Sequence, residues 1–171
     1  MSDKELYYYA NNEQVNLELE HAVIAFDLDE IKRPSRVFQN FVRQHAEQLR
    51  KSVYIVNRDD LPKEIAKIIE ANQAERPVYR AGNTVVIVLP EVRVEDDSQG
   101  NLERLVSEWV KKNDSLACIK EDIRGRVVVE PVVKSGDDAL RIASRLVEDL
   151  KIQSAQPRMI QKIQSPRPSA R

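Results

Sequence analysis

The pattern of hydrophobic and polar residues between positions 84 and 163 predicts six elements in the order strand, helix, strand, strand, helix, strand. This order is that of the split βαβ unit, so we predict an α+β fold with a ferredoxin-like βαββαβ subdomain over about 84–163. In that arrangement both helices cover one side of a four-stranded sheet. The predicted strands occupy residues 84–94, 116–123, 127–133 and 152–163, and the predicted helices occupy 102–110 and 139–150.

The residues before this unit predict a smaller α/β lobe over 1–83, in which strands and helices again alternate. Its order resembles an irregular relative of the second unit, but no sequence repeat supports a duplication. A hairpin at 78–89 joins the two parts instead of a linker, so we expect one compact body with two subdomains. The predicted elements are strands at 6–9, 15–19, 21–28, 53–56 and 77–80, a helix at 36–51 and a second helix that begins near 60–62.

Two of the predicted strands are apolar on both faces. Residues 85–89 and 127–129 carry hydrophobic side chains at successive positions. A sheet with helices on one side only should instead alternate between apolar and polar residues. The second face must therefore be covered, either by the first lobe or by a partner protein, and the sequence leaves both alternatives open.

Composition narrows the class of protein. Hydrophobic residues make up 42% of the chain and charged residues 32%, and the formal net charge is −1. The near-neutral charge argues against a nucleic-acid partner. No apolar run approaches the roughly 18 residues of a membrane span, so we expect no membrane partner. The single cysteine, Cys118, excludes an internal disulfide and is typical of a reducing compartment, so we expect a cytoplasmic location.

Motifs for catalysis are absent from the sequence. There is no Gly-x-Ser-x-Gly elbow and no phosphate-binding glycine loop. The two histidines, His21 and His45, are far apart, and His45 falls on an apolar helix face. With Cys118 as the only thiol, neither a catalytic triad nor a zinc site is expected. We therefore predict a protein that is not an enzyme and that has no cofactor, no metal and no catalytic residue.

Aromatic residues are expected in the core. Trp109 falls in register with the apolar face of the helix at 102–110, which predicts burial against the sheet. The run Tyr7-Tyr8-Tyr9 could stack bases, but neighbouring strand positions point to opposite faces and no basic cluster flanks them. Core packing is the favoured interpretation for these rings.

The last eight residues form a separate, extended tail at 164–171. Two prolines, two serines and two arginines in this segment predict no packed element. The residues of this tail are Gln164, Ser165, Pro166, Arg167, Pro168, Ser169, Ala170 and Arg171.

Several segments resemble the region that precedes the catalytic domain in bacterial subtilisin-like serine proteases, in a branch that often opens with a run of tyrosines. The tyrosines at 7–9 are followed by an Asn-x-Glu-x-Val-x-Leu pattern, and Val78-Tyr79-Arg80 is followed by the turn at 82–85. Residues 138–160 look like the helix, gap and proline-containing strand that close the prosequence in this family. Arg158 and Met159 stand where the family usually has an asparagine and an aromatic residue.

The resemblance implies a fold and a mechanism. Subtilisin propeptides have the βαββαβ fold, and they act as intramolecular chaperones and tight inhibitors of the protease. Their open sheet face packs on two helices of the enzyme, and their C-terminal tail lies in the substrate groove. The resemblance thus implies that Gln164 to Arg171 bind a subtilisin-like serine protease, in cis or in trans, with Arg171 at the cleavage site.

Two other functions fit the same sequence. The first is a protein–protein interaction or sensor module of a bacterial defence or signalling assembly. The second is a ferredoxin-like binder of small molecules or nucleic acid, which the net charge disfavours. Copurification with a protease would separate the leading prediction from both.

Overall fold

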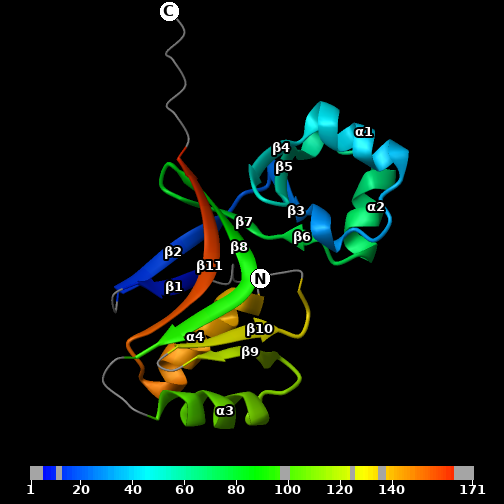
Figure 1. Ribbon diagram of the computed structural model, residues 1–171. Helices are drawn as coiled ribbons and strands as arrows, with labels where there is room; N and C mark the ends of the chain where they lie inside the picture. The colour runs from blue at the N-terminus through cyan, green and yellow to red at the C-terminus, as the bar shows by residue number, and fades with distance from the viewer. Residues whose placement is uncertain (1–5, 11–12, 97–100, 124–125, 135–137, 164–171) are drawn as a thin grey trace, which may run out of the picture.

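The computed structural model describes residues 6–10, 13–96, 101–123, 126–134 and 138–163. The fold is mixed α/β, with two antiparallel sheets (Figure 1). Within the described residues, the larger sheet has seven strands in the order β1-β2-β7-β8-β10-β9, and β11 also pairs with β8. Its strands are β1 (Leu6–Ala10), β2 (Glu13–Leu19), β7 (Val78–Ala81), β8 (Thr84–Glu95), β9 (Ala117–Ile123), β10 (Arg126–Pro131) and β11 (Ser154–Ile163).

The long strand β8 organises the larger sheet. One edge of β8 pairs with β7 over its first residues and with β10 over its last residues, from Val92 to Glu95. The other edge pairs with β11 over nearly its whole length. Two helices, α3 (Leu102–Lys112) and α4 (Asp138–Leu150), connect β8 to β9 and β10 to β11.

The smaller sheet is built from the segment between β2 and β7. Its strand order is β4-β5-β3-β6, and every pair is antiparallel. We call the segment from β3 to β6 the small lobe. Its elements are β3 (Val23–Asp27), α1 (Arg36–His45), β4 (Glu47–Arg50), β5 (Val53–Asn57), α2 (Lys63–Ala71) and β6 (Glu75–Arg76), with short 3-10 helices at Leu28–Glu30 and Arg58–Asp60.

The small lobe is an insertion in the large sheet. The strands on either side of it, β2 and β7, pair directly through Glu18 with Arg80 and Leu19 with Tyr79. The hairpin β1–β2 and the strand β7 therefore belong to the large sheet, although they precede the expected division at residue 83. The chain leaves the large sheet after β2 and returns to it at β7.

The two parts share one connectivity. In the small lobe the order strand, helix, strand, strand, helix, strand gives the sheet β6-β3-β5-β4. The segment from β8 to β11 has the same order of elements and gives the sheet β11-β8-β10-β9. In both sheets the first strand lies between the fourth and the third. The similarity is one of topology, because the sequence contains no repeat that indicates it.

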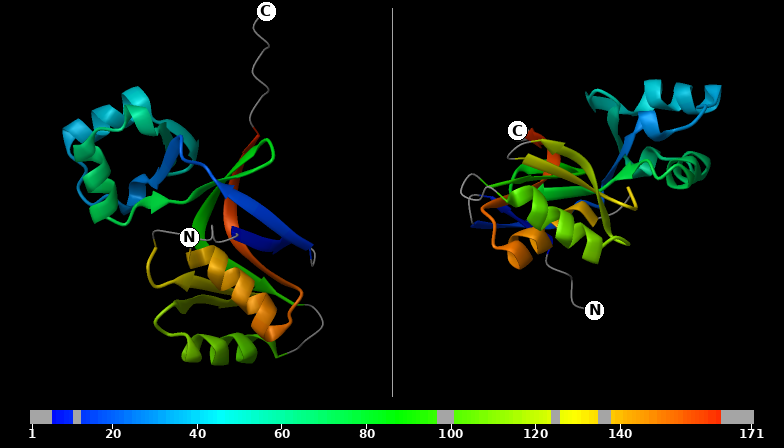
Figure 2. Two further views of the ribbon diagram at one scale, coloured as in Figure 1. Left: turned by 180° about the vertical axis from the view of Figure 1, so that it is seen from behind. Right: turned by 60° about the horizontal axis from the view of Figure 1, so that its bottom comes forward.

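Three apolar clusters hold these layers together. The first lies between the large sheet and the helices α3 and α4, on the side that we call the inner face. The second lies between the small sheet and α1 and α2. The third joins the two sheets and contains Ala25, Val53 and Ile55 of the small lobe with Val85, Ile87 and Ile160 of the large sheet. The helices thus lie on the far sides of the two joined sheets (Figure 2).

The third cluster explains why β8 is apolar on both faces. Val86 and Val88 face the inner cluster, whereas Val85 and Ile87 face the small lobe. We call the side of the large sheet opposite α3 and α4 the outer face. The small lobe covers the outer face of the first half of β8, so that the cover of this part of the strand is the first lobe and not a partner protein. Beyond Leu89 the outer positions are Glu91, Arg93 and Glu95, so that the second half of the face is polar.

The predicted helix at 36–51 is wrong in its second half. Helix α1 begins after Ser35, whose Oγ accepts a hydrogen bond from the backbone N–H of Phe38 at 3.2 Å, as expected for an N-cap. It ends at His45, because Ala46 has extended backbone angles. The next four residues form β4, and Lys51 has a φ of 49° in the tight turn to β5. Leu49, which lies four residues after His45 and would share its face in the predicted helix, packs in the cluster between the sheets.

Two predicted strands also have different bounds. The strand expected at 77–80 corresponds to β7 in the large sheet, and β6 in the small sheet precedes it as a separate two-residue strand that was not predicted. The strand expected at 127–133 ends at Pro131, and Val132 and Val133 are exposed.

Candidate functional site

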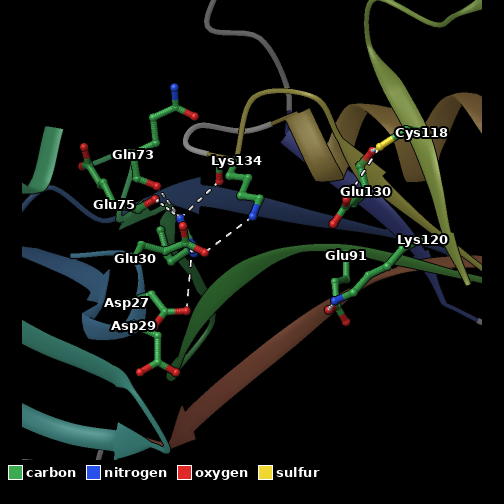
Figure 3. A network of polar contacts seen from close by, with 11 residues as sticks. Asp27, Asp29, Glu30, Gln73, Glu75, Glu91, Cys118, Lys120, Glu130 and Lys134 are labelled. Atoms are coloured by element: carbon green, nitrogen blue, oxygen red, sulfur yellow. Dashed lines mark hydrogen bonds and ion pairs between the residues drawn. The ribbon is translucent and has the colours of Figure 1, made fainter. Parts of the chain in front are cut away.

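Charged side chains gather where the small lobe meets the outer face of the large sheet. A cleft of about 240 Å³ opens there between the two parts. Its walls come from β3, β6 and the β4–β5 turn on one side and from β8, β9, β11 and Lys134 on the other. Figure 3 shows its two groups of charged side chains, one around Glu30 and Lys134 and one around Glu91 and Lys120.

Arg76 is the buried cation of this cleft. Its side chain is 1% exposed, and its Nη1 donates to the backbone carbonyls of Gln73 at 2.9 Å and Glu75 at 3.0 Å. Nη2 lies 3.4 Å from a carboxylate oxygen of Glu30 and 3.9 Å from one of Asp27. Burial lowers the pKa of the Arg76 guanidinium below its ordinary value, although both carboxylates act in the opposite direction.

Arg76 and Glu30 also connect the two parts of the protein. Arg76 Nη1 donates to the backbone carbonyl of Lys134 at 3.3 Å, and Lys134 belongs to the segment after β10. The Lys134 ammonium in turn lies 3.8 Å from Glu30. The buried arginine is therefore a tie between the lobes as well as a support for the small sheet. Its Nε has no hydrogen-bond partner in the part of the chain that the structure describes.

Glu91 is the second centre of charge in the cleft. Its carboxylate accepts from the ammonium of Lys120 on β9 and from Arg158 Nη1 on β11, the latter at 3.3 Å. Burial alone would raise the pKa of the Glu91 carboxyl, but the hydrogen bonds and charges of its two partners outweigh burial and lower it. The bond to Glu91 likewise raises the pKa of Lys120. One ionic group thus joins three strands of the large sheet, β8, β9 and β11.

Polar side chains also lie along β11 beyond the cleft. Strand β4 lies over the C-terminal half of β11, where Glu47 accepts from Lys162 at 2.8 Å and Leu49 packs in the same cluster as Ile160. At the end of β4, Arg50 lines both the cleft and a second hollow of about 500 Å³ that runs along β11. Arg93 of β8 and Arg158 of β11 also line that second hollow.

The three tyrosines of β1 point to two different sides of the strand, because successive side chains along a strand alternate between its faces. Tyr8 is buried in the inner cluster. Tyr7 and Tyr9 share the carboxylate of Glu148 on α4 as hydrogen-bond acceptor, at 2.7 and 3.1 Å, and their rings are in edge contact 5.7 Å apart. The bond to Glu148 raises the pKa of Tyr7 to about 12. Core packing thus describes Tyr8, whereas the other two rings tie β1 to α4.

The residues that the sequence singled out do not form a common site. The tail residues 164–171 lie outside the described residues. His45 is exposed and stacks on Phe41 at 5.4 Å, and the backbone carbonyl of His21 accepts from Arg58. Burial and the nearby Glu130 raise the pKa of Cys118, which makes its thiol less nucleophilic. In the described ranges no group of three or more His, Cys, Asp or Glu is placed to hold a metal ion.

The cleft residues could not have been found from sequence patterns. Arg50, Arg76, Glu91 and Arg158 come from four elements that are far apart in the chain, and no spacing relates them. The signal that existed was indirect, since Glu91 and Arg93 interrupt the hydrophobic run of β8 at outer-face positions.

The chain was compared with protein-family models, with curated proteins and with solved structures, and none of these matches it. Of the helices in the described part of the chain, none has the length and apolar character needed to cross a membrane.

The acid sensitivity of the Glu91 group can be tested. Because its pKa is lower in the folded chain than in the unfolded one, Glu91 contributes stability above about pH 4.3, and this contribution is lost as the pH falls through the folded pKa. We expect Glu91→Gln to lower the free energy of unfolding by about 0.5–1 kcal/mol at pH 7, since both partners are partly exposed. At pH 3 the difference from the parent chain should shrink. Urea titrations at both pH values measure it.

Glu70→Gln is the matched control. Glu70 is exposed on α2 and makes no ion pair with a described residue. This variant should follow the parent chain at both pH values. A Glu91→Gln effect that is equal at pH 7 and pH 3 would contradict the ionic role of Glu91.

Proposed function

We propose that the chain is a prodomain-like, non-catalytic module that binds a subtilisin-like serine protease and chaperones or inhibits it. The proposal begins from the resemblance of the sequence to the prosequences of these proteases. The strand order β11-β8-β10-β9, with α3 and α4 on one face, supports it, because a ferredoxin-like sheet has this order and this placement of helices.

The observation that carries the proposal is the position of β11 directly before the tail. β11 pairs with β8 from Ser154 to Ile163, with Ile163 opposite Thr84. Gln164 is the next residue, so the tail begins at a point fixed by a sheet strand. A tail that starts from a fixed point loses less entropy when a protease groove binds it than one on a flexible linker.

Two surfaces would then act together. The polar half of the outer face, around Arg93 and Glu95, would contact the body of the enzyme, and the tail would enter the substrate groove as an added strand. Pro166 and Pro168 lack a backbone donor, which restricts ladder hydrogen bonds to the residues around them. The segment from Ser169 to Arg171 has no such restriction, so it suits the groove best.

Removal of residues 165–171 tests this division of roles. We expect the truncated chain to inhibit a susceptible subtilisin-like protease at least about 10-fold more weakly than the full chain, because the backbone hydrogen bonds of the added strand are lost. Some binding should remain through the sheet face. Hydrolysis of a chromogenic peptide by a panel of subtilisin-like proteases measures inhibition, and circular dichroism checks that the fold is retained.

Arg171→Ala is the matched single change. It should weaken inhibition less than the truncation, unless the protease prefers basic residues at the cleavage site. Equal inhibition by the full and truncated chains would show that the tail is only a linker. A chain that binds no protease of the panel would favour the alternative of an interaction module in a signalling or defence assembly.

A further inference from the structure

We propose that the second hollow, which runs along β11, binds an extended, acidic segment of a partner protein through three arginines. We call this hollow the arginine groove. It is lined by Arg50 at the β4–β5 turn, Arg93 on β8 and Arg158 on β11, and has a volume of about 500 Å³. Among the residues that line it, Glu95 is the one carboxylate. The groove is therefore positive, although the whole chain has a formal net charge of −1.

The three arginines of the groove have N–H donors that form no hydrogen bond with the residues that the structure describes. Arg50 and Arg93 are exposed and make no ion pair or side-chain hydrogen bond with the residues that the structure describes. Arg158 donates to Glu91 through Nη1 only, and Glu91 shares its carboxylate between Arg158 and Lys120. Each guanidinium carries five N–H donors in a planar fork that matches a carboxylate. Carboxylates are therefore the groups that the groove is suited to bind.

The arginines are held by regular structure. Arg93 lies in the middle of the sheet, opposite Gln156 on β11 and Val128 on β10. Arg50 pairs with Val53 across the tight turn at Lys51, and the apolar cluster between the sheets fixes this turn next to β11. Two of the cations thus come from the large sheet and one from the small lobe. A ligand that spans all three would also hold the lobes together.

The shape of the groove favours a chain segment over a small anion. Both Ser154 and Gln161 line it, and a strand that rises about 3.3 Å per residue separates these positions by roughly 23 Å. That length accommodates several residues of an extended peptide, whereas a phosphate would contact one or two arginines. Ser154, Gln156 and Gln161 supply side-chain groups that can bond a peptide backbone.

The inference deepens the proposed function and rests on it for one point only, the identity of the protein that carries the acidic segment. Under that function, the segment belongs to the surface of the protease that faces the module. The chemistry of the groove stands without this assignment, and a free peptide tests it directly.

The test uses a fluorescein-labelled peptide with six glutamates between Gly-Ser flanks, and the same peptide with six lysines. Fluorescence polarisation with the full chain should show binding of the glutamate peptide and none of the lysine peptide. Arg50→Gln and Arg93→Gln should each weaken binding by about 5- to 10-fold, as expected for the loss of a charge-assisted contact. Glu95→Gln should strengthen binding, because it removes the opposing carboxylate.

Arg43→Gln is the control, since Arg43 is exposed on α1 at the far side of the small lobe. It should bind the glutamate peptide as the parent chain does. The proposal is overturned if the glutamate peptide does not bind, or if Arg43→Gln weakens binding as much as the groove variants do. Displacement of the peptide by low millimolar inorganic phosphate would also overturn it in favour of a simple anion site.

The two proposals can fail separately. Protease inhibition that survives in Arg50→Gln and Arg93→Gln, together with no peptide binding, refutes the groove and leaves the proposed function intact. Peptide binding that depends on these arginines, in a chain that inhibits no protease, supports the groove and removes the protease as its partner.

Discussion

Replacing Trp109 by alanine is expected to destabilise the protein by about 3–5 kcal/mol, the usual cost of removing a buried large aromatic side chain. Trp109 is 5% exposed and packs in the inner cluster between α3 and the large sheet. Its indole N–H donates to a carboxylate oxygen of Asp149 on α4 at 2.8 Å. The substitution therefore removes packing in the core and the bond that joins the two helices.

Urea denaturation followed by circular dichroism measures this effect, since Trp109 is the only tryptophan and its fluorescence is lost in the variant. Trp109→Phe separates the two contributions, because it keeps an aromatic ring but has no donor for Asp149. It should cost less than the alanine change, and Asp149→Asn should cost about 1 kcal/mol or less. A loss below about 1 kcal/mol for Trp109→Ala would mean that α3 contributes little to the core.

The elements around Trp109 could be predicted because their patterns are local. The face of α3 repeats at helical spacing, and the resulting prediction of burial is confirmed. The apolar run of β8 likewise predicts a strand that is covered on both sides. The small lobe proved to be the second cover for the first half of β8, and it depends on contacts between residues about 30 or more positions apart. Such contacts leave no periodic signal in a single sequence.

The predicted helix at 36–51 was wrong after His45, because helical spacing of apolar residues continues into a segment that forms a strand. Leu49 falls at a helical interval from His45 and Val42, so it looks like one more residue of the apolar face. In the fold Leu49 faces the large sheet, and Val42 faces the cluster under α1 and α2. The change of partner is a tertiary effect, and packing against the large sheet overrides the local preference.

The insertion of the small lobe was also invisible in the sequence. The last two residues of β2 pair with the middle two residues of β7, and the chain between these strands folds into its own sheet. Residues 20–22 contain no glycine or proline that would mark a boundary, and Pro77 was predicted as the first residue of a strand and not as the point where the chain changes sheets. The hairpin β7–β8 at Gly82 was predictable because a glycine with a φ of 60° belongs to its turn.

Arg76→Met is expected to destabilise the protein by about 2–4 kcal/mol, because a buried cation is removed while its partners remain. The backbone carbonyls of Gln73, Glu75 and Lys134 would lose their donor, and Glu30 would lose its nearer cation. Glu30 and Asp27 are partly exposed, so water can solvate them and limit the cost. The free energy of unfolding from urea titration measures the loss.

Two comparisons show whether the effect comes from burial and from the tie between the lobes. Arg80→Met removes a partly exposed cation that is paired with Glu20, and it should cost about 1 kcal/mol or less. Glu30→Gln in the Arg76→Met background should recover part of the stability, because the carboxylate that lost its nearer cation is then replaced by a neutral amide. Hydrogen exchange should quicken in β3 and β6 of the Arg76→Met variant, since the bond to Lys134 connects these strands to the large sheet. Equal losses for Arg76→Met and Arg80→Met, with unchanged exchange in the small lobe, would show that Arg76 acts as an ordinary surface cation despite its burial.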